Sequence, residues 1–138
     1  MADLTLVALN IVADFNAVIV STGVAGVALT AGDVVYADST DSGELKLAQH
    51  DGTAAEAAAV GIVLADAADT EAVTYITSGE LALGTILTAG SVYVVSATPG
   101  KIAVDADPGS ADFKTVVGVA KSTSTLEVRF IIGGGVIL

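Results

Sequence analysis

The chain has 138 residues; hydrophobic residues make up 53% of them, aromatic residues 4%, and cysteine is absent. Its formal net charge is −11 and its five basic side chains are scattered one by one, which excludes the basic patch needed to bind nucleic acid or an anionic membrane. Without cysteine the chain has no disulfide, no thiol nucleophile and no cysteine ligand for zinc.

The length indicates one domain that buries roughly 68–70% of the surface of the unfolded chain. No apolar run approaches the ~18 residues that a membrane-spanning helix needs. The first basic residue is Lys46, so the N-terminus lacks the positively charged region of a signal peptide. We therefore expect a soluble protein whose acidic surface keeps an apolar chain in solution.

Residues 1–12 are mostly apolar and are expected to form a strand or an arm that the domain or a partner covers. Residues 17–20 predict a strand, and residues 21–26 predict a turn. A further strand is predicted at residues 34–36.

The polar segment 38–43 predicts a turn, after which residues 44–48 pair back as a hairpin. Residues 53–58 are rich in alanine and predict at most one helical turn, because six residues are too few to hold a helix alone.

Residues 59–84 carry the clearest strand pattern. Alternating residues predict a strand at 60–64, an acidic turn at 66–69, and two further strands separated by a Ser-Gly turn at 78–79. This period-2 alternation is typical of antiparallel strands with one face in the core.

Residues 92–96 and 102–104 predict a second hairpin around a Pro-Gly turn. Residues 105–114 predict a loop, and residues 116–120 predict a strand. The cleanest amphipathic strand covers residues 126–132, and the three glycines that follow are expected to break it.

The two parts of the chain repeat one another. Leu-Thr-Ala-Gly occurs at 29–32 and at 87–90, an offset of 58 (87 − 29), and Val-Gly occurs at 60–61 and 117–118, an offset of 57 (117 − 60). Two copies are too few for a solenoid. We therefore predict a single all-β domain, a compact barrel or sandwich built from two duplicated β-modules. Its expected parts are an N-terminal arm with the first strands (1–26), a first β-module (27–84) and a second β-module (85–138).

Groups that could carry out catalysis or bind a metal are few. The single histidine, His50, precedes Asp51, so a Ser-His-Asp set is formally present, but His-Asp-Gly has the composition of a turn. Two groups of carboxylates lie at predicted turns without the spacing of a calcium loop: Asp38, Asp41 and Glu44, and Asp66, Asp69 and Glu71.

Other binding motifs are equally weak. The glycines at 133–135 are not followed by the helix start or lysine of a phosphate-binding loop. The three tyrosines (Tyr36, Tyr75 and Tyr93) are too dispersed to form a stacking platform for sugars or bases. We predict that the protein is not an enzyme and that it has no catalytic residue, cofactor or metal site.

The segment AVGIVLADAADTEAVTYITSGELALG, residues 59–84, resembles the central part of the head decoration (cement) proteins of tailed bacteriophages. In both, a Val-Gly-Ile strand leads through an acidic turn into a Thr-Tyr strand and a Ser-Gly turn. Residues 29–36, LTAGDVVY, and 92–100, VYVVSATPG, also resemble small cement proteins with paired halves. The resemblance covers roughly residues 27–132.

This resemblance implies a β-tulip-like domain that assembles as a homotrimer on the outer surface of the expanded capsid. There it would bridge neighbouring copies of the major capsid protein and stabilise the shell against internal DNA pressure by mass action. The protein would be made in the host cytoplasm and reside in the virion.

The resemblance also implies that the N-terminal arm orders on docking and adds a strand to a sheet of the capsid. Deleting residues 2–12 is then expected to abolish capsid binding and to leave the trimer folded. The candidate capsid-contact residues are Leu4, Leu6, Val7, Leu9 and Ile11.

Two other classes of function stay open. The first is another virion module, such as a head fibre or a tail adhesin that binds host glycan. The second is a hydrolase or a small-ligand barrel, which would require a polar pocket around His50.

Overall fold

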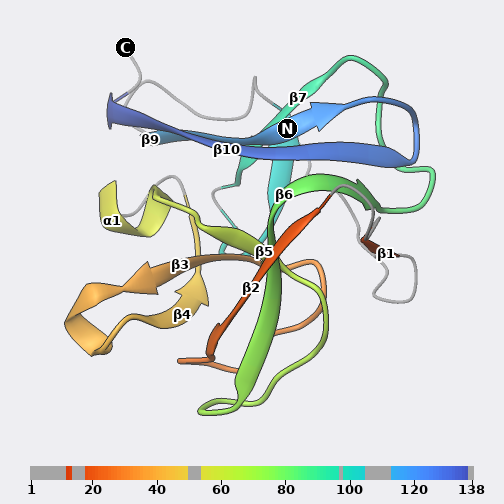
Figure 1. Ribbon diagram of the computed structural model, residues 1–138. Coiled ribbons are helices and arrows are strands. Elements are labelled where there is room, and N and C mark those ends of the chain that lie inside the picture. The colour runs from red at the N-terminus through yellow and green to blue at the C-terminus, as the bar shows by residue number, and fades with distance from the viewer. Residues whose placement is uncertain (1–11, 14–17, 50–53, 97, 105–112, 137–138) are drawn as a thin grey trace.

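The computed structural model describes residues 12–13, 18–49, 54–96, 98–104 and 113–136, and these residues are almost entirely in β-structure (Figure 1). The helical elements among them are one helical turn and one short 3-10 turn. The elements are β1 (Val12–Ala13), β2 (Ile19–Val24), β3 (Val34–Asp38), the 3-10 turn (Ser39–Asp41), β4 (Glu44–Leu47), α1 (Ala54–Ala57), β5 (Gly61–Val63), β6 (Ala72–Ala82), β7 (Val92–Val95), β8 (Ile102–Val104), β9 (Phe113–Ala120) and β10 (Thr125–Val136). The predicted all-β class is confirmed.

All ten strands belong to one antiparallel sheet that curls on itself (Figure 1). Its main path runs β4-β3-β5-β6-β10-β9-β7-β8, with β1 and β2 added to β6. If β3, β4, β5 and β6 are matched with β7, β8, β9 and β10, the order reads the same from either end. The two halves of the sequence are thus two equivalent four-strand units that meet at the β6–β10 pair.

The repeated Leu-Thr-Ala-Gly segments make the same turn in both halves. The amide of Gly32 donates to the carbonyl of Val63 at 2.8 Å, and the amide of Gly90 donates to the carbonyl of Ala120 at 2.8 Å. Both glycines have positive φ (96° and 84°), which side chains rarely adopt. The predicted boundaries of the modules at residues 26 and 84 stay predictions.

β6 is one continuous strand, so the predicted Ser-Gly turn at 78–79 is wrong. Ser78 and Gly79 pair with Arg129 and Val128 of β10, and Gly79 has a φ of 118°. The first part of β6 pairs with β2 and β5, and its last part pairs with β10 and β1. The Ser-Gly segment therefore marks the point at which the strand changes partners.

A predicted turn and a predicted strand break are also wrong. Residues 21–24 extend β2 and pair with residues 72–75 of β6, because cross-strand bonding outweighs the local preference of Ser-Thr-Gly for a turn. The glycines at 133–135 do not end β10, which continues to Val136 opposite Phe113 after an irregularity in the pairing. β9 likewise starts at Phe113, within the predicted loop.

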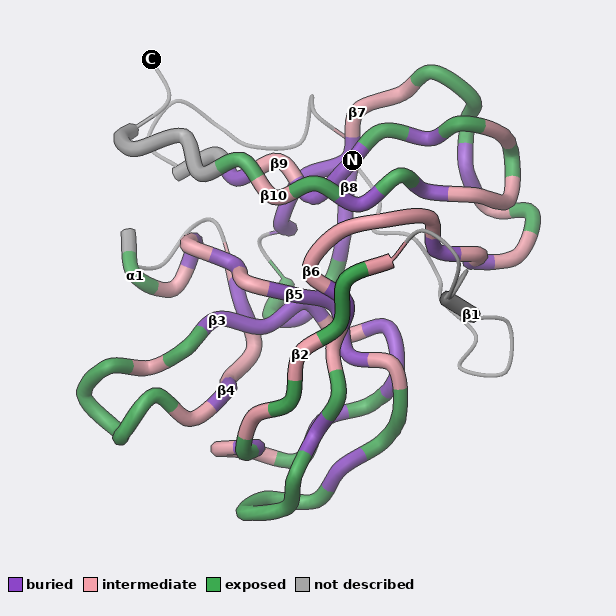
Figure 2. The backbone as a smooth tube through the Cα atoms, viewed as in Figure 1, coloured by how far each residue is buried: buried purple, intermediate pink, exposed green. Residues whose placement is uncertain are grey.

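The core consists of two clusters on opposite faces of β3 and β5. Val34 and Ile62 belong to the larger cluster, which also contains Tyr93, Ile102 and other buried residues of the second half. Val35 and Val63 belong to a smaller cluster formed within the first half. All three residues of β5 are therefore buried, and the predicted alternation of buried and exposed residues is wrong for this strand (Figure 2).

The second Val-Gly repeat brings β9 very close to β10. A side chain at Gly118 would collide with the backbone carbonyl oxygen of Glu127 and lie 3.1 Å from the Cα of Val128. Backbone cannot swing aside as the end of a flexible side chain can, so this position requires glycine.

We expect Gly118→Ala to lower the free energy of unfolding by about 2–4 kcal/mol, because the added methyl group forces β9 and β10 apart. Denaturant titration followed by circular dichroism measures the change. Gly43→Asn is the matched control, because Gly43 faces open space and asparagine tolerates its φ of 76°. An alanine variant as stable as the wild type would contradict the packing described for this strand pair.

Candidate functional site

Several of the predicted site residues lie outside the described residues. These are the candidate capsid contacts Leu4, Leu6, Val7, Leu9 and Ile11, and the His50–Asp51 pair. They remain predictions.

The first group of carboxylates is organised by Lys46 rather than arranged around a cation site. The Lys46 Nζ lies 2.9 Å from Asp38 Oδ2 and 3.0 Å from Asp41 Oδ2. Asp38 Oδ1 also accepts hydrogen bonds from the hydroxyl of Thr40 at 2.6 Å and from its amide at 3.0 Å. These contacts fix the tip of the β3–β4 hairpin.

The same contacts stabilise the charged forms of both partners. The Thr40 hydroxyl, followed by Lys46 and the Thr40 amide, lowers the pKa of Asp38 to about 2. Hydrogen bonds from Lys46 to Asp38 and Asp41 raise the pKa of Lys46. Because the Lys46 ammonium lies between the two carboxylates, a metal cation would have to displace it.

The second group of carboxylates shapes a turn. Asp66 Oδ1 accepts from the Ala31 amide at 2.9 Å, and Glu71 Oε1 accepts from the Ala68 amide at 2.7 Å. Across the described ranges, no three side chains of His, Asp or Glu come together as a metal site would require.

Asp33 is a partly buried carboxylate that lies beside Gly100 of the β7–β8 turn. Its Oδ2 accepts from the Thr30 amide at 2.9 Å, and burial is the main cause that raises its pKa. Next to it, the Val34 amide donates to the Gly100 carbonyl at 2.9 Å, while the Gly100 amide donates to the Ala48 carbonyl at 2.8 Å. These backbone hydrogen bonds connect the first half to the β7–β8 turn of the second.

The tyrosines do not form an exposed aromatic platform. Tyr36 is 8% exposed and Tyr93 is 1% exposed, and the Tyr93 hydroxyl accepts from the Thr88 amide at 2.9 Å. Tyr75 packs partly buried against the smaller core cluster. A sugar ring would find little aromatic surface on these side chains.

The exposed large hydrophobic side chains of the described residues gather in two places. One is the β2 patch, formed by Ile19, Val20 and Val24, in which Ile19 is 62% exposed. The other lies on the β9–β10 hairpin, where Val119 is 42% exposed and Ile131 is 54% exposed. Figure 2 shows β2 as a largely exposed strand at the front of the molecule.

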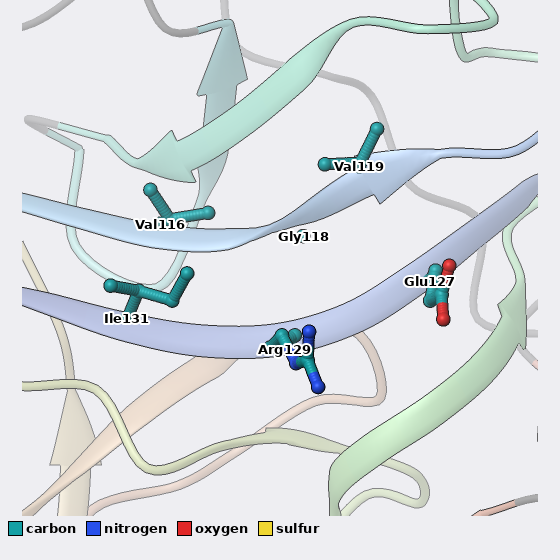
Figure 3. A pocket seen from close by; sticks show the side chains of 6 residues that line it. All are labelled: Val116, Gly118, Val119, Glu127, Arg129 and Ile131. Atoms are coloured by element: carbon teal, nitrogen blue, oxygen red, sulfur yellow. The ribbon is translucent and has the colours of Figure 1, made fainter.

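The surface of the hairpin is hollowed. This β9–β10 hollow has a volume of about 140 Å³ (Figure 3), and its lining residues are Val116, Gly118, Val119, Glu127, Arg129 and Ile131. Val116 pairs with Ile131 at one end, and Val119 pairs with Glu127 at the other. Gly118 lies between these two pairs and contributes only backbone to the lining.

Sequence reasoning found part of this arrangement. It placed Glu127 and Arg129 on the exposed face of an amphipathic strand, and both are exposed, while Leu126 and Val128 are buried as that pattern requires. It missed the hollow. The available signal was Ile131, an aliphatic residue in phase with the charged face of the strand.

The comparisons with known proteins add no relative: no protein-family model, curated protein or solved structure matches the chain. In the part of the chain that the structure describes, no helix has the length and hydropathy required to cross a bilayer.

The lowered pKa of Asp38 predicts a specific dependence of stability on pH. The folded-state pKa of about 2 lies below the value of about 3.9 in unfolded chains. The stabilisation is therefore complete above the unfolded pKa and is lost as the pH falls through the folded pKa.

We expect the difference in unfolding free energy between wild type and Asp38→Asn to be constant above about pH 5 and to shrink toward pH 2. Urea titrations at each pH measure it, and Ser39→Asn is the control at an exposed neighbouring position. A difference that stays the same down to pH 2 would show that Asp38 titrates normally.

Proposed function

We propose that the protein is a non-enzymatic structural component of a tailed-phage virion. In this proposal it binds the outer surface of the expanded capsid as a homotrimer, contacts the major capsid protein and stabilises the shell against the pressure of packaged DNA.

The observation that carries the proposal is the distribution of exposed apolar side chains. Among the described residues, the large exposed hydrophobics lie in the β2 patch and the β9–β10 hollow, on a chain whose net charge is −11. Gathered apolar surface on an otherwise acidic protein is typical of sites that contact other proteins. Because residues 59–84 resemble cement proteins, we assign the proposed contacts to the phage capsid and to other copies of this chain.

A glycan-binding virion module is less well supported. Sugar recognition commonly uses exposed aromatic faces, whereas Tyr36 and Tyr93 are buried in the core. The β9–β10 hollow is lined by aliphatic side chains with Glu127 and Arg129 and contains no aromatic ring. We therefore place protein–protein contact ahead of glycan binding.

Co-sedimentation with phage heads tests the proposal. Purified protein is mixed with undecorated expanded heads and, separately, with unexpanded shells of the same phage. We expect saturable binding to the expanded heads only, and bound protein should raise the temperature at which these heads release their DNA, because a ligand stabilises the state that it binds. Equal binding to both forms, or binding to neither, would reject the proposal.

The N-terminal arm gives a second test. Deleting residues 2–11 leaves β1, which pairs with Leu81 and Ala82 of β6, in the chain. We expect this variant to lose binding to expanded heads and to keep the melting temperature of the wild type, because the arm is proposed to contact the capsid through an added strand.

Point variants test whether binding depends on particular side chains of the arm or only on the presence of the arm. Leu4→Ser with Leu6→Ser should weaken head binding, and Thr5→Ala should not, because the alternating aliphatic residues are the proposed contacts. Full binding by the deletion variant would show that the arm plays no part in docking.

A further inference from the structure

The equivalence of the two halves allows one face of the sheet to be compared with its counterpart. In the first half, Val34 pairs with Ile62, and Ile62 pairs with Ile76, so the three side chains form a row across β3, β5 and β6. All three are fully buried, because this face packs against the second half in the larger core cluster.

Among the described residues, nothing packs over the corresponding row in the second half. Val92 pairs with Val119, and Val119 pairs with Glu127, across β7, β9 and β10. Val119 and Glu127 are exposed and Val92 is partly exposed. The β9–β10 hollow is thus the unpartnered counterpart of a face that, in the first half, packs tightly against another sheet.

The hollow has an apolar lining, so a partner that fills it would present exposed aliphatic side chains. The β2 patch meets this requirement: β2 itself pairs only with β6 among the described strands, and the residue that follows it, Ala25, forms an isolated bridge with Leu45 of β4. Ile19, Val20 and Val24 are exposed along it. An unpaired edge that carries aliphatic side chains is a ready docking element.

Charge favours a second copy of this chain as the source of that element. Copies with a net charge of −11 repel one another, so contact between them is least costly where carboxylates are absent. Residues 18–32, which include β2, carry no charged side chain. In the hollow, Glu127 and Arg129 carry opposite charges, so the rim is locally balanced.

We propose that the β2 patch of one copy packs into the β9–β10 hollow of the next. The two surfaces are different, so the contact is head-to-tail and closes into a ring when the rotation between copies allows it. Val116, Val119 and Ile131 would provide the apolar centre, with Glu127 and Arg129 at the rim. The proposal concerns contacts between copies and holds whether or not the assembly binds a capsid.

Double substitutions to lysine test the two surfaces separately. The variants are Ile19→Lys/Val20→Lys in the patch and Val119→Lys/Ile131→Lys in the hollow; the control is Ala37→Lys/Ser39→Lys, at exposed positions outside both. Light scattering gives the mass of each, and circular dichroism checks the fold. We expect the wild type and the control to be oligomeric, and each test variant to associate at least about 100-fold more weakly because a buried ammonium is costly.

Mixing the two test variants distinguishes head-to-tail contact from a symmetric one. Each retains one intact surface, so the mixture should form a one-to-one heterodimer although each variant alone is monomeric. A monomeric wild type, a patch variant that assembles normally, or a mixture that stays monomeric would each overturn the proposal.

Disulfide crosslinking gives a test that does not depend on whether the lysine variants fold. Because the chain has no cysteine, each introduced cysteine is the only thiol. Val20→Cys and Val119→Cys are mixed and mildly oxidised. The proposal predicts that the disulfide-linked heterodimer exceeds either homodimer at least about tenfold, because disulfides need closely apposed residues. Homodimers in equal or greater amounts would overturn it.

Discussion

The pairing of β6 with β10 is the constraint on which the rest of the structure depends. Each half of the chain forms its own four strands, and these two strands join them into one sheet. Gly79, opposite Val128, sits where β6 leaves β2 and β5 and takes up β10 and β1. The φ of 118° at this position favours glycine and lets the strand serve both halves without interruption.

The two halves have equivalent strand orders, but once they are joined, equivalent faces of their sheets differ in burial. One face of β3 and β5 becomes core by packing on the second half, and the other face is closed by the smaller cluster around Val35 and Val63. No further unit within the described residues covers the matching face at Val119. The asymmetric packing of two equivalent halves therefore leaves an apolar sheet face at the surface, and the proposed contact between copies rests on this feature.

The sequence predicted best what is determined locally. Both hairpins were placed correctly, because their turns carry Gly43 and Gly100 at positive φ and the flanking residues favour strands. It failed at Ser78-Gly79, at residues 21–24 and at the glycines 133–135. In each case pairing with another strand outweighs a local signal for a turn or a break, and such pairing cannot be seen in one stretch of sequence.

For the candidate surfaces, too, the features set by local sequence were predictable and those set by strand pairing were not. The exposed charges of β10 were predictable from alternation, since Leu126 and Val128 define its buried face. The hollow was not, because it depends on Gly118 lying beside Glu127 and on Ile131 standing next to Val116 from another strand. Only the register of β9 against β10 brings these residues together.

The acidic surface and the two exposed apolar surfaces are the features on which the proposed role in an assembly rests. Electron cryomicroscopy of expanded heads incubated with the protein is the most direct test. The account predicts ordered added density on the outer surface at equivalent lattice positions, in which the β9–β10 hollow of each copy faces a neighbouring copy. Bare heads, or copies whose hollows all face solvent, would contradict it.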